Sequence, residues 1–448
     1  MTRIKRPSAA QIDRFVRDLG KQGVRHVRFE LPDMHGTSRA KVVPIDAVAG
    51  YAKRGLNFYG GTLALDTASS VVPGALYHEQ VKYRDQQLIP ELSTVRPVPW
   101  LEDTVKVICD TEWAPGEPLR AAPRYVLRQL LERAAALGFE AMMGHEFEFY
   151  VLDGETMKPP FDGLQIFNVV RNQYMPVIDD LLEFLPAAGI DIITHNCEYA
   201  PSQFEINYRA GKGLAAADTA FTFKNAVKEI CHRGGMHATF MTKPFPDSAG
   251  CGCHFHISLW DRKTGRNVFL DKKTADGLSD TCRWFIQGVL DHAPAMMALA
   301  NPTPNCYRRL KPHTFAPSNI SWGIEDRTAL VRVKATGDEQ THIEVRVPSA
   351  LSNPYLAAAG ALAGGLLGLD KKKKLQRTSK GVSEADAGFA PLPATLDAAL
   401  DALARDRVYV KALGEEFVEV FSAVKRFELG RFHEHISDWE TSEYLDVY

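Results

Sequence analysis

The sequence lacks the long apolar stretch that a membrane-spanning helix requires. Its longest strongly apolar run, Leu356 to Leu369, is rich in alanine and glycine and falls short of the ~18 residues that would indicate a span. Asn353 and Pro354 stand where a helix cap and a first-turn proline belong, so we expect this run to form a buried helix. The stretch from Met1 to Ala10 also lacks the apolar core of a signal peptide. These absences predict a cytoplasmic protein without a membrane partner.

An excess of charge of one sign is also absent. The chain has 53 lysines and arginines against 55 acidic residues, a formal net charge of -2, which argues against nucleic acid as a partner. Its seven cysteines are scattered and odd in number, which argues against a disulfide framework. Cys251 and Cys253 are too few to form a structural zinc site, so we expect them to be structural thiols.

The length of the chain indicates more than one packed unit. Its 448 residues exceed the ~100 to 200 of a typical single domain. A cluster of proline and glycine between Trp113 and Ala122 is typical of a linker, and a helix is predicted to begin at Pro123. We therefore expect an N-terminal domain of residues 1–112 and a larger domain of residues 113–448.

The two domains differ in their periodic patterns. An amphipathic stretch from Ala10 to Leu19 and two β-like runs, Val27 to Leu31 and Arg39 to Val43, predict a small α+β unit at the N-terminus. The second domain alternates short strands with predicted helices at Arg124–Leu137, Leu214–Cys231, Gly277–Leu290 and Arg407–Phe427. This pattern favours a sheet or partial barrel backed by helices, and thus the α+β class overall.

Ionisable side chains recur at every second position in four predicted strands. Because alternate residues of a strand share one face, each strand presents its polar set on one side. These sets are Glu146 and Glu148; Glu205, with Glu198 just upstream; His254, His256 and Ser258; and His342, Glu344 and Arg346. One such strand is explained equally well by a solvent-facing edge strand. Four strands that carry Glu, His and Arg, and no Lys, favour a binding site.

The residue types on these faces indicate the chemistry. Closely spaced carboxylates repel one another and need a cation between them, and carboxylates with one imidazole suit Mg²⁺ or Mn²⁺. Guanidinium groups bind carboxylate and phosphate in a bidentate manner. The arginines that could act in this way are Arg308, Arg309, Arg327, Arg332 and Arg346. Metal ions and arginines acting on phosphate together indicate phosphoryl transfer.

These segments resemble the glutamine synthetase superfamily, in the same order and over nearly the whole chain. The matching segments are Gly144–Phe149, Asn196–Asn207, Lys243–Ser258, Asn305–Leu310, Asn319–Val333 and His342–Leu356. Near the N-terminus, Asp33–Gly36 and Lys41–Pro44 resemble the entry to the family's β-grasp domain. The resemblance implies a small N-terminal β-grasp domain and a catalytic domain with a curved antiparallel sheet.

The resemblance also implies a role for each polar residue. Glu148, Glu198 and Glu205 would hold one divalent metal, and Glu146, His254 and Glu344 a second. His256, Ser258 and Arg332 would lie along ATP; Gly250, Arg309 and Arg346 would hold glutamate; Arg327 would stabilise the transferring phosphoryl group. The family reaction joins the γ-carboxylate of glutamate to an amine through γ-glutamyl phosphate. Similar enzymes are homo-oligomers, dodecamers of two hexameric rings, with active sites between subunits.

Two positions depart from the family pattern. Tyr59, in the loop Phe58–Thr62, and Phe315, in Pro312–Pro317, stand where glutamine synthetases carry the acids of the ammonium pocket. An aromatic ring suits an alkylated amine better than ammonium, so we expect a small alkylamine such as methylamine. Ammonia, a polyamine and ethanolamine remain alternatives. The base that deprotonates the amine is unassigned, with Tyr59, Glu325 and Asp326 as candidates.

Two other classes of function compete with a ligase. A two-metal hydrolase uses similar carboxylates and histidines to activate water, but it has no need of so many arginines. A nitrogen-sensing pseudoenzyme would bind the ligands without turnover, but all six metal ligands that the resemblance implies are present. Dependence of product formation on ATP separates the ligase from the hydrolase.

Overall fold

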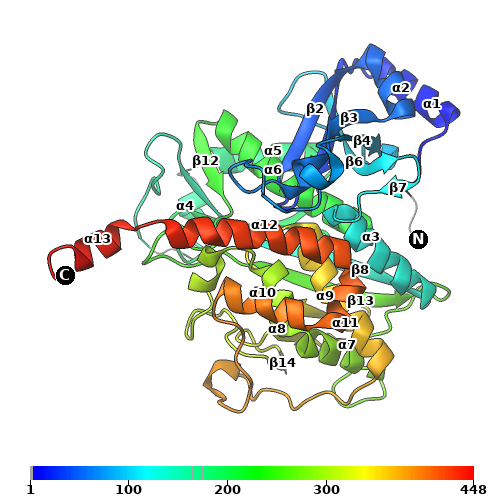
Figure 1. Ribbon diagram of the computed structural model, residues 1–448. Coiled ribbons are helices and arrows are strands. Elements are labelled where there is room, and N and C mark those ends of the chain that lie inside the picture. The colour runs from blue at the N-terminus through cyan, green and yellow to red at the C-terminus, as the bar shows by residue number, and fades with distance from the viewer. Residues whose placement is uncertain (1–3, 164–165, 173–174) are drawn as a thin grey trace.

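The computed structural model describes residues 4–163, 166–172 and 175–448, and its strands form two sheets (Figure 1). The N-terminal sheet has the order β2-β1-β6-β4-β3, with β5 and β7 paired to β6. Its strands are β1 His26–Pro32, β2 Ser38–Pro44, β3 Leu56–Tyr59, β4 Asp85–Pro90, β5 Arg96–Pro97, β6 Thr104–Ala114 and β7 Glu117–Pro118. Helices α1 (Ala9–Lys21) and α2 (Ile45–Arg54) complete the predicted small α+β unit.

Local sequence signals explain the first elements of this unit. The Ser8 hydroxyl accepts from the backbone N–H of Gln11, and the Gln11 side-chain oxygen accepts from the backbone N–H of Ser8. This capping box satisfies two of the free amides at the start of α1. Between β1 and β2, the Asp33 carboxylate accepts from the backbone N–H of His35 and Thr37, both at 2.9 Å. Gly36 takes φ +78°, a left-handed conformation that glycine adopts readily. The predicted helix and both strands are confirmed.

The predicted linker at 113–122 is wrong in its first half. Strand β6 continues to Ala114 and pairs with β7, which ends at Pro118, and the two strands turn at Gly116 with φ +88°. The proline and glycine there form a hairpin of the N-terminal sheet. The boundary expected after residue 112 therefore falls inside β6, and α3 begins at Pro123 as predicted.

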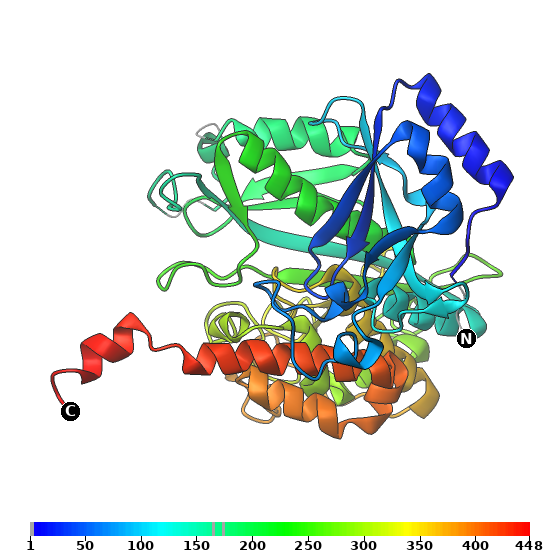
Figure 2. The ribbon, with the colours of Figure 1, turned by 45° about the horizontal axis from the view of Figure 1, so that its top comes forward.

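The second sheet has the order β14-β15-β16-β13-β8-β10-β9, with β11 and β12 paired to β8. Its pairs are antiparallel except for β14 and β15, which run parallel. The strands are β8 Phe139–Asp153, β9 Ile192–Cys197, β10 Gln203–Tyr208, β11 Gly211–Lys212, β12 Met236–Thr239, β13 Cys253–Asp261, β14 Trp322–Ile324, β15 Val331–Lys334 and β16 His342–Val345. Together with its helices the sheet forms the curled half-barrel expected of the fold (Figure 2).

Helices pack around this sheet and form most of the core. They are α3 Pro123–Ala136, α4 Val169–Asn172, α5 Val177–Ala187, α6 Leu214–Arg233, α7 Asp280–Asp291, α8 Ala293–Ala300, α9 Pro354–Lys371, α10 Leu396–Arg405, α11 Arg407–Leu413 and α12 Glu415–Glu434. A last helix, α13 Asp438–Tyr444, has no buried residue. Helix α9 is the predicted buried helix, capped by the side chain of Asn353. It packs against α7 so closely that a Cβ on Gly368 would lie 2.1 Å from the carbonyl oxygen of Trp284.

The predicted helix from Arg407 to Phe427 is two helices. Gly414 has φ +105°, outside the helical range, and it separates α11 from α12. Helix α12 runs past the N-terminal domain, and α13 then extends away from the body of the chain (Figures 1 and 2). Ile436, Trp439 and Leu445 of this C-terminal segment are more than half exposed.

Among the described residues, no helix is both long and apolar enough to cross a membrane. All seven cysteines are buried free thiols. Cys251 and Cys253 lie in the core beneath the catalytic sheet, as expected for structural thiols.

Candidate active site

Strand β8 places two carboxylates on one face of the second sheet. Phe147 and Phe149 point into the core and are fully buried, while Glu146 and Glu148 point to the opposite face, as the alternation predicted. The strand register then adds a partner to each acid. His254 on β13 lies opposite Glu146, and Glu205 on β10 lies opposite Glu148.

The remaining polar strands extend the same face. His256 on β13 lies opposite Glu344 on β16, and Glu344 lies opposite Arg332 on β15. The Nδ1 atom of His254 lies 2.7 Å from a Glu146 oxygen and 3.8 Å from a Glu344 oxygen. Four strands that are distant in sequence thus meet at one patch.

Ligand atoms from five of the six predicted metal ligands fall into two overlapping groups. One group is Glu146, His254 and Glu344; the other is Glu148, Glu205 and His254; within each, the atoms lie within 4.8 Å of one another. Glu198 lies beside them and accepts a hydrogen bond from the Asn196 amide at 2.9 Å. Five of the six expected residues thus lie within ligand distance of one another in these two groups, and Glu198 is close enough to Glu148 and Glu146 to feel their charges. Their binding of metal stays a prediction.

The electrostatics of this cluster indicate a need for positive charge. Burial and the carboxylates of Glu146, Glu148 and Glu198 raise the pKa of Glu205 to about 10. Burial and the charge of Glu148 raise the pKa of Glu198 to about 7. Burial also raises the pKa of Glu146. Hydrogen bonds from His254 and His256 outweigh this effect and hold the pKa of Glu146 below its usual range. Carboxylates that must take up protons to coexist are suited to divalent cations.

The donor set also fits the expected type of metal. Five carboxylates and one imidazole offer mainly oxygen ligands, which Mg²⁺ and Mn²⁺ prefer, and no thiolate belongs to either group. His254 carries a lowered pKa because it is buried and close to the Arg346 charge, so its imidazole is neutral and able to donate a lone pair.

Two arginines and a glycine adjoin the acids. A Cβ on Gly250 would lie 2.9 Å from Cγ of Arg309, and a Cβ on Gly252 would lie 2.6 Å from an Arg309 nitrogen, so only glycine allows this approach. The side chain of Arg309 is buried and donates to the carbonyl of Arg346 at 3.3 Å. Arg346 in turn forms an ion pair with Glu344. Gly250, Arg309 and Arg346 therefore lie together beside the metal ligands.

The residues expected along the nucleotide lie at the other side of the cluster. Arg332 donates to Glu344 at 3.1 Å, and its Nε donates to Glu325 at 3.1 Å. The Nδ1 atom of His256 lies 3.1 Å from Nε2 of His342. Ser258 is on the same face of β13 and accepts from the Trp260 indole at 3.0 Å. His342 is a neighbour of the expected nucleotide residues to which no role was assigned from sequence.

Two predicted residues make no hydrogen bond or ion pair with the cluster among the described residues. Arg327 is exposed and has no hydrogen bond or ion pair within the described residues. Tyr59 ends β3 in the N-terminal domain, where its hydroxyl lies 2.8 Å from Nδ1 of His78. Its carbonyl accepts from Gln86 and Thr62 of the same domain. Within one chain, Tyr59 and Phe315 belong to separate parts of the molecule.

An aromatic pair flanks the metal ligands. Phe315 takes φ +54° and stacks on Tyr199, with ring centroids 6.3 Å apart and planes inclined by 23°. Tyr199 follows Glu198 directly, and the carbonyl of Phe315 accepts from Arg346 at 3.5 Å. Both rings are about half exposed, at 46% for Tyr199 and 51% for Phe315. Sequence reasoning missed Tyr199, although its place beside a predicted metal ligand was a usable signal.

The other candidate bases are engaged in hydrogen bonds. The buried Asp326 carboxylate accepts from Thr328, Ser379 and Ser383. The pKa of Glu325 is lowered because, against some desolvation, Lys334 and Arg332 donate hydrogen bonds to it. A carboxylate held in this way is a weak proton acceptor.

The site therefore combines a cluster of carboxylates and one imidazole, suited to divalent cations, with arginines able to bind anions. A family model described as "Glutamine synthetase, catalytic domain" matches residues 120–444. A glutamine synthetase from Methanocaldococcus jannaschii is 34% identical, with 97% of this chain and 98% of that protein aligned. A glutamate–isopropylamine ligase from a Pseudomonas species is 32% identical over 96% of this chain and 97% of its own.

A solved GmaS–ADP complex has a TM-score of 0.86 and 30% identity, covering 96% of this chain and 99% of its own. The chain belongs to the glutamine synthetase family, whose members are ATP-dependent and divalent-metal-dependent glutamate ligases.

Proposed function

We propose that this protein joins glutamate to a small alkylamine, methylamine above all, and is a γ-glutamylmethylamide synthetase. The observation that carries the proposal is the aromatic pair of Tyr199 and Phe315, which stands beside the metal cluster where the family pattern has a carboxylate at position 315. The relatives support an alkylamine, because they include a glutamate–isopropylamine ligase and GmaS. The Phe58–Thr62 loop and the ending His435–Tyr444 also resemble γ-glutamylmethylamide synthetase.

We assign the metal ligands as the sequence predicted. Glu148, Glu198 and Glu205 hold one cation, and Glu146, His254 and Glu344 hold the other. Divalent cations bound there supply charge neutralisation of the triphosphate. The strand register supports this division, because it opposes Glu205 to Glu148 and His254 to Glu146.

The remaining residues hold the substrates. Arg309 and Arg346 bind the carboxylates of glutamate, and the backbone at Gly250 completes that pocket. Arg332, with His256 and Ser258, lies along ATP. Arg327 stabilises the transferring phosphoryl group, and its exposed side chain has no competing partner among the described residues. Because His256, Ser258 and Arg332 are on strands of one sheet and the buried Arg309 donates to the Arg346 backbone, the substrates would be held in fixed positions, with the γ-carboxylate aligned with the γ-phosphorus before reaction.

Two bonds are exchanged in sequence. An oxygen of the γ-carboxylate attacks the γ-phosphorus of ATP, and ADP leaves with the electrons of the broken bond. The neutral amine then attacks the γ-carbonyl carbon, phosphate leaves, and the amide nitrogen gives up a proton. Bare ammonium gains little from a ring, whereas an alkyl group gains apolar contact with Phe315 and Tyr199.

We also propose that a third aromatic residue of the amine pocket, Tyr59, comes from another subunit. Tyr59 has its hydrogen bonds in the N-terminal domain of its own chain, apart from Phe315. The site would be completed if the N-terminal domain of a neighbouring copy covered it, as in the expected dodecamer of two hexameric rings. The exposed Trp439 and Leu445 of the C-terminal segment support a homo-oligomer.

Amine competition tests the proposal. With glutamate, ATP and Mg²⁺, we expect methylamine to exceed ammonia, ethanolamine and putrescine in kcat/KM for phosphate release. Phe315→Glu should move the methylamine-to-ammonia ratio toward ammonia by about tenfold, since it replaces ring contact with a carboxylate. Phe315→Leu, which keeps an apolar side chain, is the matched control and should move the ratio less. A wild-type enzyme that prefers ammonia contradicts the alkylamine assignment, and product formation without ATP contradicts the ligase.

A further inference from the structure

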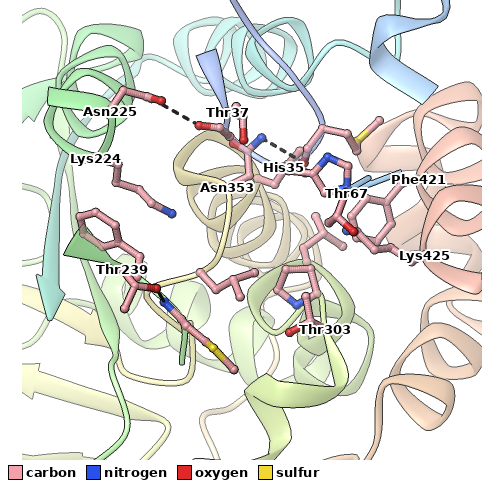
Figure 3. Close-up of a pocket in the computed structure, with 18 of the residues that line it drawn as sticks. His35, Thr37, Thr67, Lys224, Asn225, Thr239, Thr303, Asn353, Phe421 and Lys425 are labelled. Atoms are coloured by element: carbon pink, nitrogen blue, oxygen red, sulfur yellow. Dashed lines mark hydrogen bonds between the residues drawn. The ribbon is translucent and has the colours of Figure 1, made fainter. Parts of the chain in front are cut away.

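A cavity of about 270 Å³ lies between the N-terminal domain and the catalytic domain (Figure 3). The β1–β2 turn contributes His35, helix α6 contributes Lys224 and Lys228, and helix α12 contributes Lys425. The cavity is on the other face of the sheet from the metal cluster, because the Lys224 ammonium lies 5.2 Å from the ring of Phe147, which points away from Glu146 and Glu148. It is therefore separate from the active site.

Every ionisable side chain that lines this cavity is basic. His35, Lys224, Lys228 and Lys425 line it, and none of the described aspartates or glutamates does. Hydroxyl and amide groups complete the polar lining: Thr37, Thr67, Thr239, Thr303, Asn225 and Asn353. Hydroxyls and ammonium groups are donors to anionic oxygens, so the lining is suited to a negatively charged ligand.

The two buried ammonium groups have donors to spare. Lys425 is 1% exposed at its side chain and donates to Glu428 at 2.8 Å. Lys224 donates to the carbonyls of Ala350 at 2.8 Å and Ser352 at 2.9 Å. An ammonium group has three donors, so three of the six remain without a protein acceptor among the described residues. Buried donors of this kind are costly unless a ligand or water accepts from them.

The nearby acids are already engaged. The oxygen Oε1 of Glu428 accepts from His35 at 2.6 Å and from the Thr67 amide at 3.2 Å. Asp33 accepts from Arg39 at 2.8 Å. These carboxylates do not line the cavity, and they balance part of its charge through His35 and Lys425, which leaves the lysines in excess.

Repulsion among the lysines also indicates an anionic ligand. Burial and the neighbouring charge of Lys228 lower the pKa of Lys224 to about 8. Lys228 itself is exposed at the rim and has no hydrogen bond or ion pair within the described residues. As with the clustered acids of the active site, like charges gathered around a space favour a counter-ion within it.

We propose that this cavity binds a small organic dianion, such as a dicarboxylate, with its charges between Lys228 and Lys425. Leu356 and Phe421 line the cavity as well, and they provide apolar contact for a short carbon chain. The volume limits the ligand to a few heavy atoms, below the ~300 Å³ of a typical drug-sized site. A ligand there contacts the β1–β2 turn, α6 and α12 together.

Dicarboxylate binding to the complete enzyme tests this site. Succinate would be titrated calorimetrically at constant ionic strength, with acetate, chloride and inorganic phosphate as comparison anions. Because succinate and phosphate also resemble active-site ligands, the titration is repeated with Arg346→Met. We expect succinate to bind more tightly than acetate, and its binding to persist in Arg346→Met.

Variants of the cavity complete the test. Lys228→Met should weaken succinate binding by about tenfold or more, as expected for loss of one charge-assisted hydrogen bond. Lys228 is exposed, so this variant tests the site even if Lys425→Met fails to fold. Three outcomes would overturn the proposal. They are unchanged succinate binding in Lys228→Met, loss of all succinate binding in Arg346→Met, and no succinate binding in the wild type. Tighter binding of phosphate than of succinate would overturn the dicarboxylate preference. These outcomes are independent of the amine preference.

Discussion

Replacement of Glu205 by glutamine should stabilise the metal-free protein. In the folded chain the pKa of Glu205 is about 10, against 4.5 for an unperturbed glutamate. Between these values the folded state holds a proton that the unfolded state has released, so rising pH favours unfolding. At about 1.4 kcal/mol per pH unit, the cost at pH 7 is about 3 kcal/mol. Glu205→Gln removes this cost because glutamine does not titrate.

Metal should reverse the order of stability. With Mn²⁺ bound, the wild type gains a ligand that Glu205→Gln lacks, so the wild type should become the more stable protein. Urea unfolding at pH 7, in EDTA and in Mn²⁺, measures both differences.

Glu140→Gln is the matched control. Glu140 is also on β8 but is half exposed in an ion pair with Lys212, so it should change stability by less than about 1 kcal/mol in either condition. A less stable Glu205→Gln in EDTA, or an equal gain from Mn²⁺ in both proteins, would refute the reasoning.

Two further predictions concern packing and pH. Gly368→Ala should destabilise the fold by about 1 to 3 kcal/mol, because its Cβ would lie 2.1 Å from the Trp284 carbonyl oxygen, whereas Gly430→Ala, with no atom within 4 Å of its Cβ, should be neutral or stabilising in thermal unfolding. Against the effect of burial, the hydrogen bond from His35 and the charge of Lys425 lower the pKa of Glu428 to about 2. The ionised form of Glu428 therefore stabilises the fold above pH 4.5, and Glu428→Gln should lose about 3 kcal/mol of stability at pH 7. In urea titrations this loss should become smaller as the pH falls from 4.5 toward 2.

The polar strands could be predicted because their pattern is local. Alternation along β8 determines that Glu146 and Glu148 share a face, whatever else the chain does. The convergence of Glu205, His254 and Glu344 on that face depends on strand order and register, which came from the family resemblance. Periodicity alone predicts which residues of a strand share a face. It does not predict which strands lie next to one another.

Other features escaped prediction because they depend on the surrounding structure. Tyr199 and Phe315 are distant in sequence, so no local sequence pattern predicts that their rings stack. Gly414 lies in a stretch of good helix formers, and only its φ of +105° reveals the break between α11 and α12. A Pro–Gly cluster such as the one near Gly116 is equally typical of a hairpin and of a linker. Only the pairing of β7 with β6 shows that this segment is a hairpin.

The two faces of strand β8 have different roles, one in the core and one in the proposed active site. Phe147 and Phe149 fill the core, and Glu146 and Glu148, which alternate with them, carry the proposed chemistry. Inserting or deleting one residue upstream within this strand would turn both carboxylates inward and both rings outward. Folding and catalysis would then fail in the same event, so in evolution this strand can drift by substitution far more readily than by a change of length.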